Sequence, residues 1–279
     1  MHIRLSFLRG LSRLGTAVAF CVLPWLNAAG MHGVSGSLFS LDVFGWPFGD
    51  PAALVQTLAG GGRPGAHFLL GVGSSLALAF LLGRVFCGWL CPYGLLSEAA
   101  ATLGGRLRAR PRAWKVPARW ELACRAVVLA AGTGLAACGI PALTRLSFPG
   151  TLSLAPQIAC YNGFDGVFFG LLAAPVTALL LEFLTGERLW CRFVCPQGLL
   201  LGCAARLRSW CERWSRLPLP AVRWEASCCS CKGETPCAAA CTLGVQPRRK
   251  DGPDALRCSI CGECVSVCAR KGRALRWKV

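Results

Sequence analysis

The sequence predicts an all-α membrane bundle of four transmembrane helices, built as two parallel hairpin repeats and followed by a small cysteine-rich α+β domain. Three observations favour this class. Of the 279 residues, 54% are hydrophobic and only 15% are charged, which is too apolar for an ordinary soluble chain. A cysteine motif occurs twice, and nearly half of the 19 cysteines follow residue 220. We expect the bundle in residues 1–220 and the second domain in residues 221–279.

Four stretches are long and apolar enough for a membrane-spanning helix, which needs about 20 such residues. The expected spans are about Leu11–Gly30, His67–Phe86, Glu121–Leu143 and Phe164–Trp190. Pro175 lies inside the fourth span, where a neighbouring helix or a local readjustment can satisfy the freed carbonyl.

Basic residues alternate between the two sides of these spans. They are dense before the first span, in the 97–120 loop and after the fourth span, and sparse in the 31–66 and 144–163 loops. The positive-inside rule therefore predicts a multi-pass protein with both termini in the cytoplasm. This alternation uses much of the net charge of +17, so we do not expect nucleic acid as a partner.

The repeated cysteine motif reads aromatic-C-x3-C-P-x-G-L-L. Its copies begin at Phe86 and Trp190, 104 residues apart, each at the cytoplasmic end of an even-numbered span. Cysteines four residues apart share one helix face, and the proline after each pair is expected to disturb that helix. The repeat thus predicts that four thiols converge across a pseudo-twofold axis: Cys87, Cys91, Cys191 and Cys195.

Three interpretations of these four thiols remain open. Four thiolates suit a third iron–sulfur cluster or a soft metal ion. A redox or docking motif is the second interpretation. The third is packing, because free cysteine often behaves as a small buried hydrophobe.

The last cysteines follow the spacing of bacterial ferredoxins. Cys258-x2-Cys261-x2-Cys264-x3-Cys268 is the ferredoxin run, with Ala269 where a proline is usual. A divergent partner motif, C-x2-C-x5-C-x3-C, begins at Cys228, which is preferred to its neighbour Cys229 because it gives the x2 gap. Zinc also binds C-x2-C pairs, but the x2-x2-x3 run is more typical of ferredoxins. The second domain is therefore expected to be bacterial-ferredoxin-like, with two [4Fe–4S] clusters.

In ferredoxins the fourth cysteine of each motif binds the other cluster. Under this rule cluster 1 takes Cys228, Cys231, Cys237 and Cys268. Cluster 2 takes Cys258, Cys261, Cys264 and Cys241. The domain is short, so its clusters are expected to hold it together.

The two C-x3-C-P turns, the four spans and the twin-cluster domain together resemble the NapH/MauN family of membrane ferredoxin-type (4Fe–4S) proteins. The resemblance covers nearly the whole chain and implies a bacterial inner (cytoplasmic) membrane location. It also implies quinol oxidation, with electrons passed to a ferredoxin-like subunit or a multihaem c-type cytochrome and on to a periplasmic reductase. The expected activity is that of a quinol dehydrogenase component working in a complex.

Quinol oxidation needs a group that accepts protons. The candidates are Glu182 within the fourth span, where a lone charge is costly, and His32 and His67 near the outer face. For Glu182 the alternative is an ion pair with Arg188 or Arg84. Two other functions remain open: a maturation factor that supplies electrons to a metal or disulfide in a partner, and an anchor that docks a soluble ferredoxin.

Overall fold

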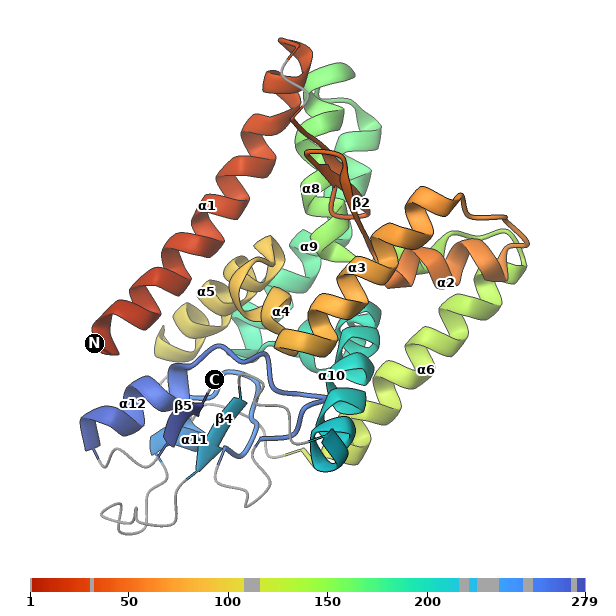
Figure 1. Cartoon of the computed structure of the whole chain (residues 1–279). Helices are drawn as coiled ribbons and strands as arrows, with labels where there is room; N and C mark the ends of the chain where they lie inside the picture. Colours follow the sequence, from red (N-terminus) through yellow and green to blue (C-terminus); the bar gives the residue numbers. More distant parts are fainter. Residues whose placement is uncertain are drawn as a thin grey trace.

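The computed structural model describes most of the chain as a mainly helical molecule. The N-terminal end of the first helix and the C-terminal domain lie at the same end of it (Figure 1). The described residues are 2–30, 33–107, 116–215, 221–224, 236–247, 253–271 and 275–278.

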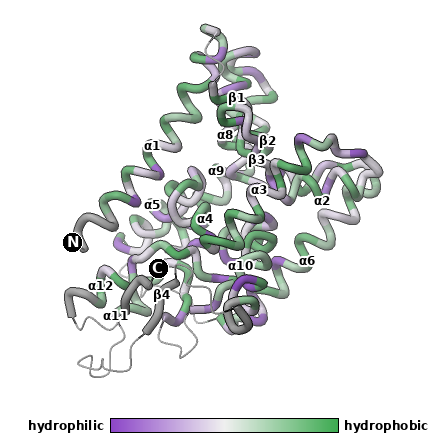
Figure 2. Tube along the Cα trace, viewed as in Figure 1, coloured by the Kyte–Doolittle hydropathy of each residue, from purple (hydrophilic) through white to green (hydrophobic). Residues whose placement is uncertain are grey.

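Within the described residues, three helices are long and apolar enough to cross a membrane: α1 (His2–Ala28), α6 (Ala118–Ala137) and α9 (Gly166–Thr185). The expected second span is α3 (Ala66–Leu82), an apolar helix of 17 residues. Hydrophobic residues predominate along much of these helices (Figure 2). Three of the four expected spans are thus candidate membrane helices, and the four-span bundle stays a prediction.

The expected spans were too long at their C-terminal ends. Helix α3 ends at Gly83, with φ +73°, and α9 ends at Gly186, with φ +72° in the left-handed region. Glycine adopts such a conformation without steric cost and therefore stops a helix. Apolar residues resume after Arg84 in the first case, and Leu189 and Trp190 follow Glu187 and Arg188 in the second, so the expected spans ran past both glycines. Pro175 lies inside α9 without ending it.

The connection between α1 and α3 contains a small sheet, which the expectation of an all-α bundle did not include. Strands β1 (Val34–Ser37), β2 (Ser40–Val43) and β3 (Trp46–Gly49) form an antiparallel meander. Val43 pairs with Trp46 across a two-residue turn, Phe44-Gly45, in which both φ angles are positive. This is the turn that matches the twist of a hairpin.

Each repeat also carries a short helix between its two spans. In the first repeat this is α2 (Pro51–Ala59), and in the second it is α8 (Phe148–Tyr161), preceded by α7 (Ala142–Leu146). Asp50 caps α2 by accepting a hydrogen bond from the Ala52 N–H at 2.8 Å. The Ser147 hydroxyl, at the start of α8, donates to the Asp50 carboxylate at 2.5 Å. The two short helices therefore meet at their N-terminal ends.

The cysteine turns follow α3 and α9. The first contains α4 (Val85–Trp89) and leads into α5 (Pro92–Leu107). The second contains a π-helical turn, Trp190–Val194, and leads into α10 (Pro196–Ser215). A buried cluster joins them at the centre of the molecule, with Cys91, Tyr93, Phe148 and Ala178 at its core.

The C-terminal region combines strands and helices, as the α+β expectation requires. Strand β4 (Ala221–Trp224) pairs antiparallel with β5 (Leu275–Lys278). Between them lie α11 (Pro236–Ala239) and α12 (Glu263–Lys271). Whether this region is a ferredoxin domain, and where its boundary falls, stay predictions.

Candidate iron–sulfur centres

The four turn cysteines line one cavity, as the repeat predicted. Cys87, Cys91, Cys191 and Cys195 all line this small cavity. Its other walls come from both turns, from the start of α8 and from the C-terminal domain: Arg84, Phe86, Tyr93, Gly94, Pro149, Arg188, Gln197, Leu243 and Ser259. Segments distant in sequence thus enclose the thiols.

The proline of each turn begins a new helix. Pro92 and Pro196 are the first residues of α5 and α10, where a missing N–H costs nothing. The preceding cysteine acts as the cap, because the Cys91 sulfur accepts from the Gly94 N–H at 3.2 Å. The second turn repeats this contact from Gly198 to Cys195 at 3.3 Å. The expectation of one disturbed helix is corrected, since the C-P-x-G sequence places a sulfur at a helix N-terminus.

Two arginines that the sequence analysis did not assign to this site lie beside the thiols. An Arg188 nitrogen is 3.5 Å from the Cys191 sulfur, and an Arg84 nitrogen is 3.9 Å from the Cys87 sulfur. Both arginines are 3% exposed. Each stands three residues before its cysteine, so extending the repeat by three residues identifies the pair.

Burial disfavours the thiolate form of these cysteines. It raises the pKa of Cys91 and Cys191, and that of Cys195 to about 12. Positive charge offsets this cost, and the described lining holds two arginines and no carboxylate. The Arg84 Nε is buried and has no partner among the described residues. Four thiols, two cations and an orphaned donor fit an anionic thiolate-ligated cluster.

A second cavity gathers the four cysteines assigned to cluster 2. Cys241, Cys258, Cys261 and Cys264 line it together. The Val245 and Ile260 N–H groups donate to the sulfurs of Cys241 and Cys258 at 3.3 and 3.4 Å. Such bonds are among the factors that set cluster potentials. Burial also raises the pKa of Cys258 to about 12, so here too a bound metal must favour the thiolate.

The residues assigned to cluster 1 are only partly described. Cys237 and Cys268 are buried, on α11 and α12, which pack against each other. Cys228, Cys229 and Cys231 lie outside the described residues. No three His, Cys, Asp or Glu side chains of the described residues are grouped to hold a single metal ion. In a [4Fe–4S] cluster, by contrast, each cysteine binds a different iron. The ligand assignment stays a prediction.

The two cavities share a wall, since Leu243 and Ser259 line both. The first turn holds this wall in place. The Trp89 indole donates to the Ile260 carbonyl at 3.1 Å, and Arg84 donates to the Leu256 carbonyl at 2.8 Å. The segment around Cys258 is therefore fixed against the membrane bundle.

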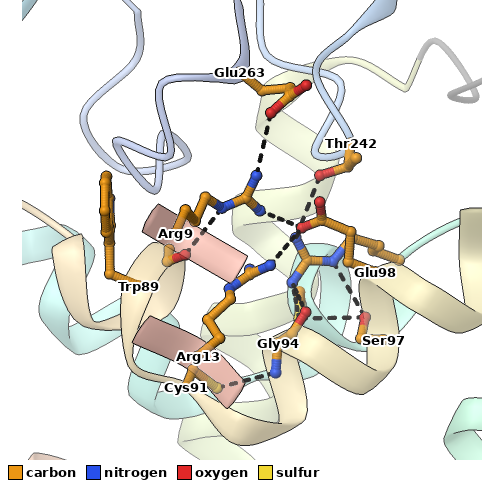
Figure 3. A network of polar contacts seen from close by, with 12 residues as sticks. Arg9, Arg13, Trp89, Cys91, Gly94, Ser97, Glu98, Thr242 and Glu263 are labelled. Atoms are coloured by element: carbon orange, nitrogen blue, oxygen red, sulfur yellow. Dashed lines mark hydrogen bonds and ion pairs between the residues drawn. The ribbon is translucent and has the colours of Figure 1, made fainter. Parts of the chain in front are cut away.

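A buried ionic network supports the same junction (Figure 3). Glu98 on α5 pairs with Arg9 and with Arg13, the latter at 2.9 Å. Arg9 also approaches Glu263 of α12 at 3.6 Å. On the other side, Glu121 on α6 accepts from Arg192 at 2.6 Å and from Arg257 at 2.7 Å. Arginine–carboxylate contacts thus connect the bundle to the C-terminal domain on two sides.

Glu182 is fully buried and its contacts lie beside the second turn. It accepts from the Trp190 N–H at 2.9 Å and from the Tyr93 hydroxyl at 3.3 Å. The ring of Trp190 stacks on Phe148 with centroids 3.7 Å apart. These two contacts come from neutral groups, whereas the charge of Arg188 also acts on the Glu182 carboxylate, so the alternative of an interaction with Arg188 stays a prediction. The two contacts position the residue before Cys191, and a proton-accepting role stays a prediction.

The two histidine candidates are less informative. His67 lies in the first turn of α3 with its side chain 65% exposed, and its Nε2 is 3.4 Å from an Asp42 oxygen. His32 lies outside the described residues. His67 does not line either cysteine cavity.

The apolar helices and the paired cysteine cavities define a membrane iron–sulfur protein. The family described as "4Fe-4S binding domain" matches residues 65–111 and 167–218, which contain one cysteine turn each. The chain is a distant homologue of the ferredoxin-type proteins NapH and MauN. The relatives it matches carry the names of ferredoxin-type and electron transport proteins.

NapH of Haemophilus influenzae is 26% identical over 96% of this chain and 88% of NapH. The methylamine utilization protein MauN of Methylorubrum extorquens is 31% identical over 69% of this chain and 63% of MauN. YccM of Escherichia coli is 27% identical over 80% of this chain and 60% of YccM. The chain therefore spans less than two thirds of MauN and of YccM. No solved structure matches it.

Proposed function

We propose that this chain is a membrane electron-transfer subunit that oxidises quinol and passes electrons through iron–sulfur centres to a partner of a periplasmic reductase. The partner would be a ferredoxin-like subunit or a c-type cytochrome, as the resemblance to NapH implies. The wall shared by the two cysteine cavities carries this proposal. Two centres separated by single side chains are close enough for an electron to pass directly between them.

The proposal includes three [4Fe–4S] clusters, two in the C-terminal domain and one at the turns. A cubane core with four thiolates carries a net charge of about −2 when oxidised. The turn cavity supplies four cysteines and two arginines, so its charge complements such a cluster. A buried charge needs this compensation, because an unpaired one is very costly. The family match over both turns, with its 4Fe-4S description, supports the same assignment.

Each bound cluster would supply the ability to accept and release one electron. The protein residues hold the sulfurs, separate the centres and accept protons. Gly94 and Gly198 N–H groups hold the capping sulfurs, and Ser259 with Leu243 separates the centres and excludes water. A quinol releases two electrons and two protons, so two one-electron centres and a proton acceptor are needed. Glu182 and His67 remain the candidates for that acceptor.

The test is iron analysis and EPR of the anaerobically purified full chain, before and after a quinol analogue is added. The proposal expects about twelve irons per chain and reduction of at least one centre by quinol. Cys87→Ser should lose about four irons. Cys203→Ser is the matched control, because this exposed cysteine on α10 lines neither cavity, and it should lose none.

Each outcome bears on a different part of the proposal. About eight irons, unchanged in Cys87→Ser, would remove the turn centre and leave the ferredoxin pair. Centres that stay oxidised with quinol, yet accept electrons from dithionite, would contradict quinol oxidation. That result would favour a maturation factor, which uses the same centres to reduce a partner.

A further inference from the structure

Arg84 and Arg188 occupy equivalent positions in the two repeats and make equivalent contacts. Each lies beside a turn thiol, Cys87 or Cys191. Each also reaches the C-terminal domain beside a cysteine assigned to cluster 2. Arg84 donates to the Leu256 carbonyl, two residues before Cys258, at 2.8 Å. Arg188 donates to the Thr242 hydroxyl, next to Cys241, at 3.3 Å.

The two cavities differ in charge but little in hydrogen bonding. In each cavity at least two cysteine sulfurs of the described residues accept a backbone N–H, so this contribution is similar in the two. The described lining of the turn cavity includes both arginines, whereas that of the cluster 2 cavity includes none. The turn sulfurs also sit at the positive N-terminal ends of α5 and α10. Positive charge therefore lines one of two adjacent centres, and part of it is offset because Glu98 pairs with Arg188 at 3.5 Å.

We propose that Arg84 and Arg188 raise the reduction potential of the centre held by the four turn cysteines above that of the neighbouring ferredoxin centre. This inference rests on the proposed function. Reduction adds one electron and no proton, so the cluster becomes more negative by one charge. Nearby cations stabilise the more negative form, and both guanidinium groups are 3% exposed, where water screens them little.

The order of the two reduction potentials determines which centre a quinol can reduce in the proposed reaction. Quinols are weaker reductants than low-potential ferredoxins, so they reduce only a centre whose potential is raised. The turn centre would then be the first to fill, and electrons arriving at the ferredoxin centres would also move toward it. The two arginines are thus positioning residues that set the potential of a centre and do not touch substrate.

The experiment is an EPR-monitored redox titration of the full chain in detergent. The turn centre is identified as the signal that disappears in Cys87→Ser. Arg84→Gln and Arg188→Gln remove one charge each, while Arg84→Lys and Arg188→Lys keep it. Arg206→Gln is the control for net charge, since Arg206 is 63% exposed and 4.0 Å from Asp254.

An arginine charge about 6 Å from the cluster, at an effective dielectric constant of about 20, favours the reduced form about 100-fold. Each Gln variant should therefore lower the potential of the turn centre by about 120 mV, at about 59 mV per tenfold for one electron. The ferredoxin centre should move less. The Lys variants should retain most of the potential, and Arg206→Gln should leave it unchanged.

Two results would overturn the inference. The first is a turn centre in the unaltered protein that is reduced at or below the potential of the ferredoxin centres, a measurement that needs no arginine variant to fold. The second is a Lys variant that shifts the potential as much as its Gln counterpart, which would make the effect structural. A missing turn centre, with about eight irons, would instead refute the third cluster of the proposed function.

Discussion

Helices α5 and α9 pack backbone against backbone at Gly104, which provides a sharp test of the fold. A Cβ added at Gly104 would lie 2.7 Å from the Phe183 carbonyl carbon and closer still to its oxygen. Gly105, the next residue, has only the Gly186 carbonyl oxygen, at 3.9 Å. Gly104→Ala and Gly105→Ala therefore add the same methyl group at neighbouring positions. At Gly104 the methyl group meets the Phe183 backbone, whereas at Gly105 it enters nearly open space.

The difference in stability follows from this contact. Real Cβ atoms essentially never come within 3.0 Å of such neighbours, so the two helices must separate in Gly104→Ala. Overpacking of this kind costs about 1–3 kcal/mol. The gain in helix propensity, about 1 kcal/mol, is common to both variants and cancels. Gly104→Ala is thus expected to be less stable than Gly105→Ala by about 1–3 kcal/mol.

Thermal unfolding in detergent measures this difference, as a Tm about 3–10 °C lower for Gly104→Ala. Iron content is the second measurement. Because α5 begins after Cys91 and α9 leads to Cys191, a separation of these helices should also reduce iron at the turn centre. Equal Tm values and equal iron content in the two variants would refute the backbone contact and the reasoning built on it.

Two further predictions concern other close contacts. A Cβ at Gly88 would press on the Ser259 carbonyl, so Gly88→Ala should weaken docking of the C-terminal domain by about 1–3 kcal/mol. Faster hydrogen exchange over residues 253–262 would show this, and Gly73→Ala, with open space around it, should leave exchange unchanged. Burial raises the pKa of Asp50 from 3.8 to about 6, so the folded state binds its proton more tightly than the unfolded state. The free energy of unfolding should fall by roughly 3 kcal/mol as pH rises from about 4 to about 6. Asp50→Asn should flatten this slope in Tm, and an unchanged slope would contradict the burial of the Asp50 carboxyl as the cause.

The sequence predicted the convergence of the turn cysteines because a repeat constrains two places at once. Cys87 and Cys191 stand at the same position of a duplicated motif, so equivalent folding brings them to one axis. The spacing around Cys258 likewise predicted the set of cysteines that lines the second cavity. In both cases the signal is a fixed spacing of cysteines in the sequence, and this spacing limits where they can lie in the folded protein.

Other features left no such signal. The stop of α3 at Gly83 depends on one backbone angle, while hydropathy continues past it. The sheet of β1–β3 and the helix α8 lie in connections that charge counting treats only as loops. In the sequence alone, Arg84 and Arg188 look like ordinary basic residues near a membrane interface. Their role depends on tertiary contacts and not on local pattern.

The wall formed by Leu243 and Ser259 has a consequence for biosynthesis. Both residues follow all four turn cysteines in the chain, so they are synthesised after them. During synthesis the turn cavity is therefore open on the side that this wall later closes. A cofactor delivered to the turns has this interval in which to enter without any unfolding, and the segment that carries Leu243 and Ser259 then closes the cavity.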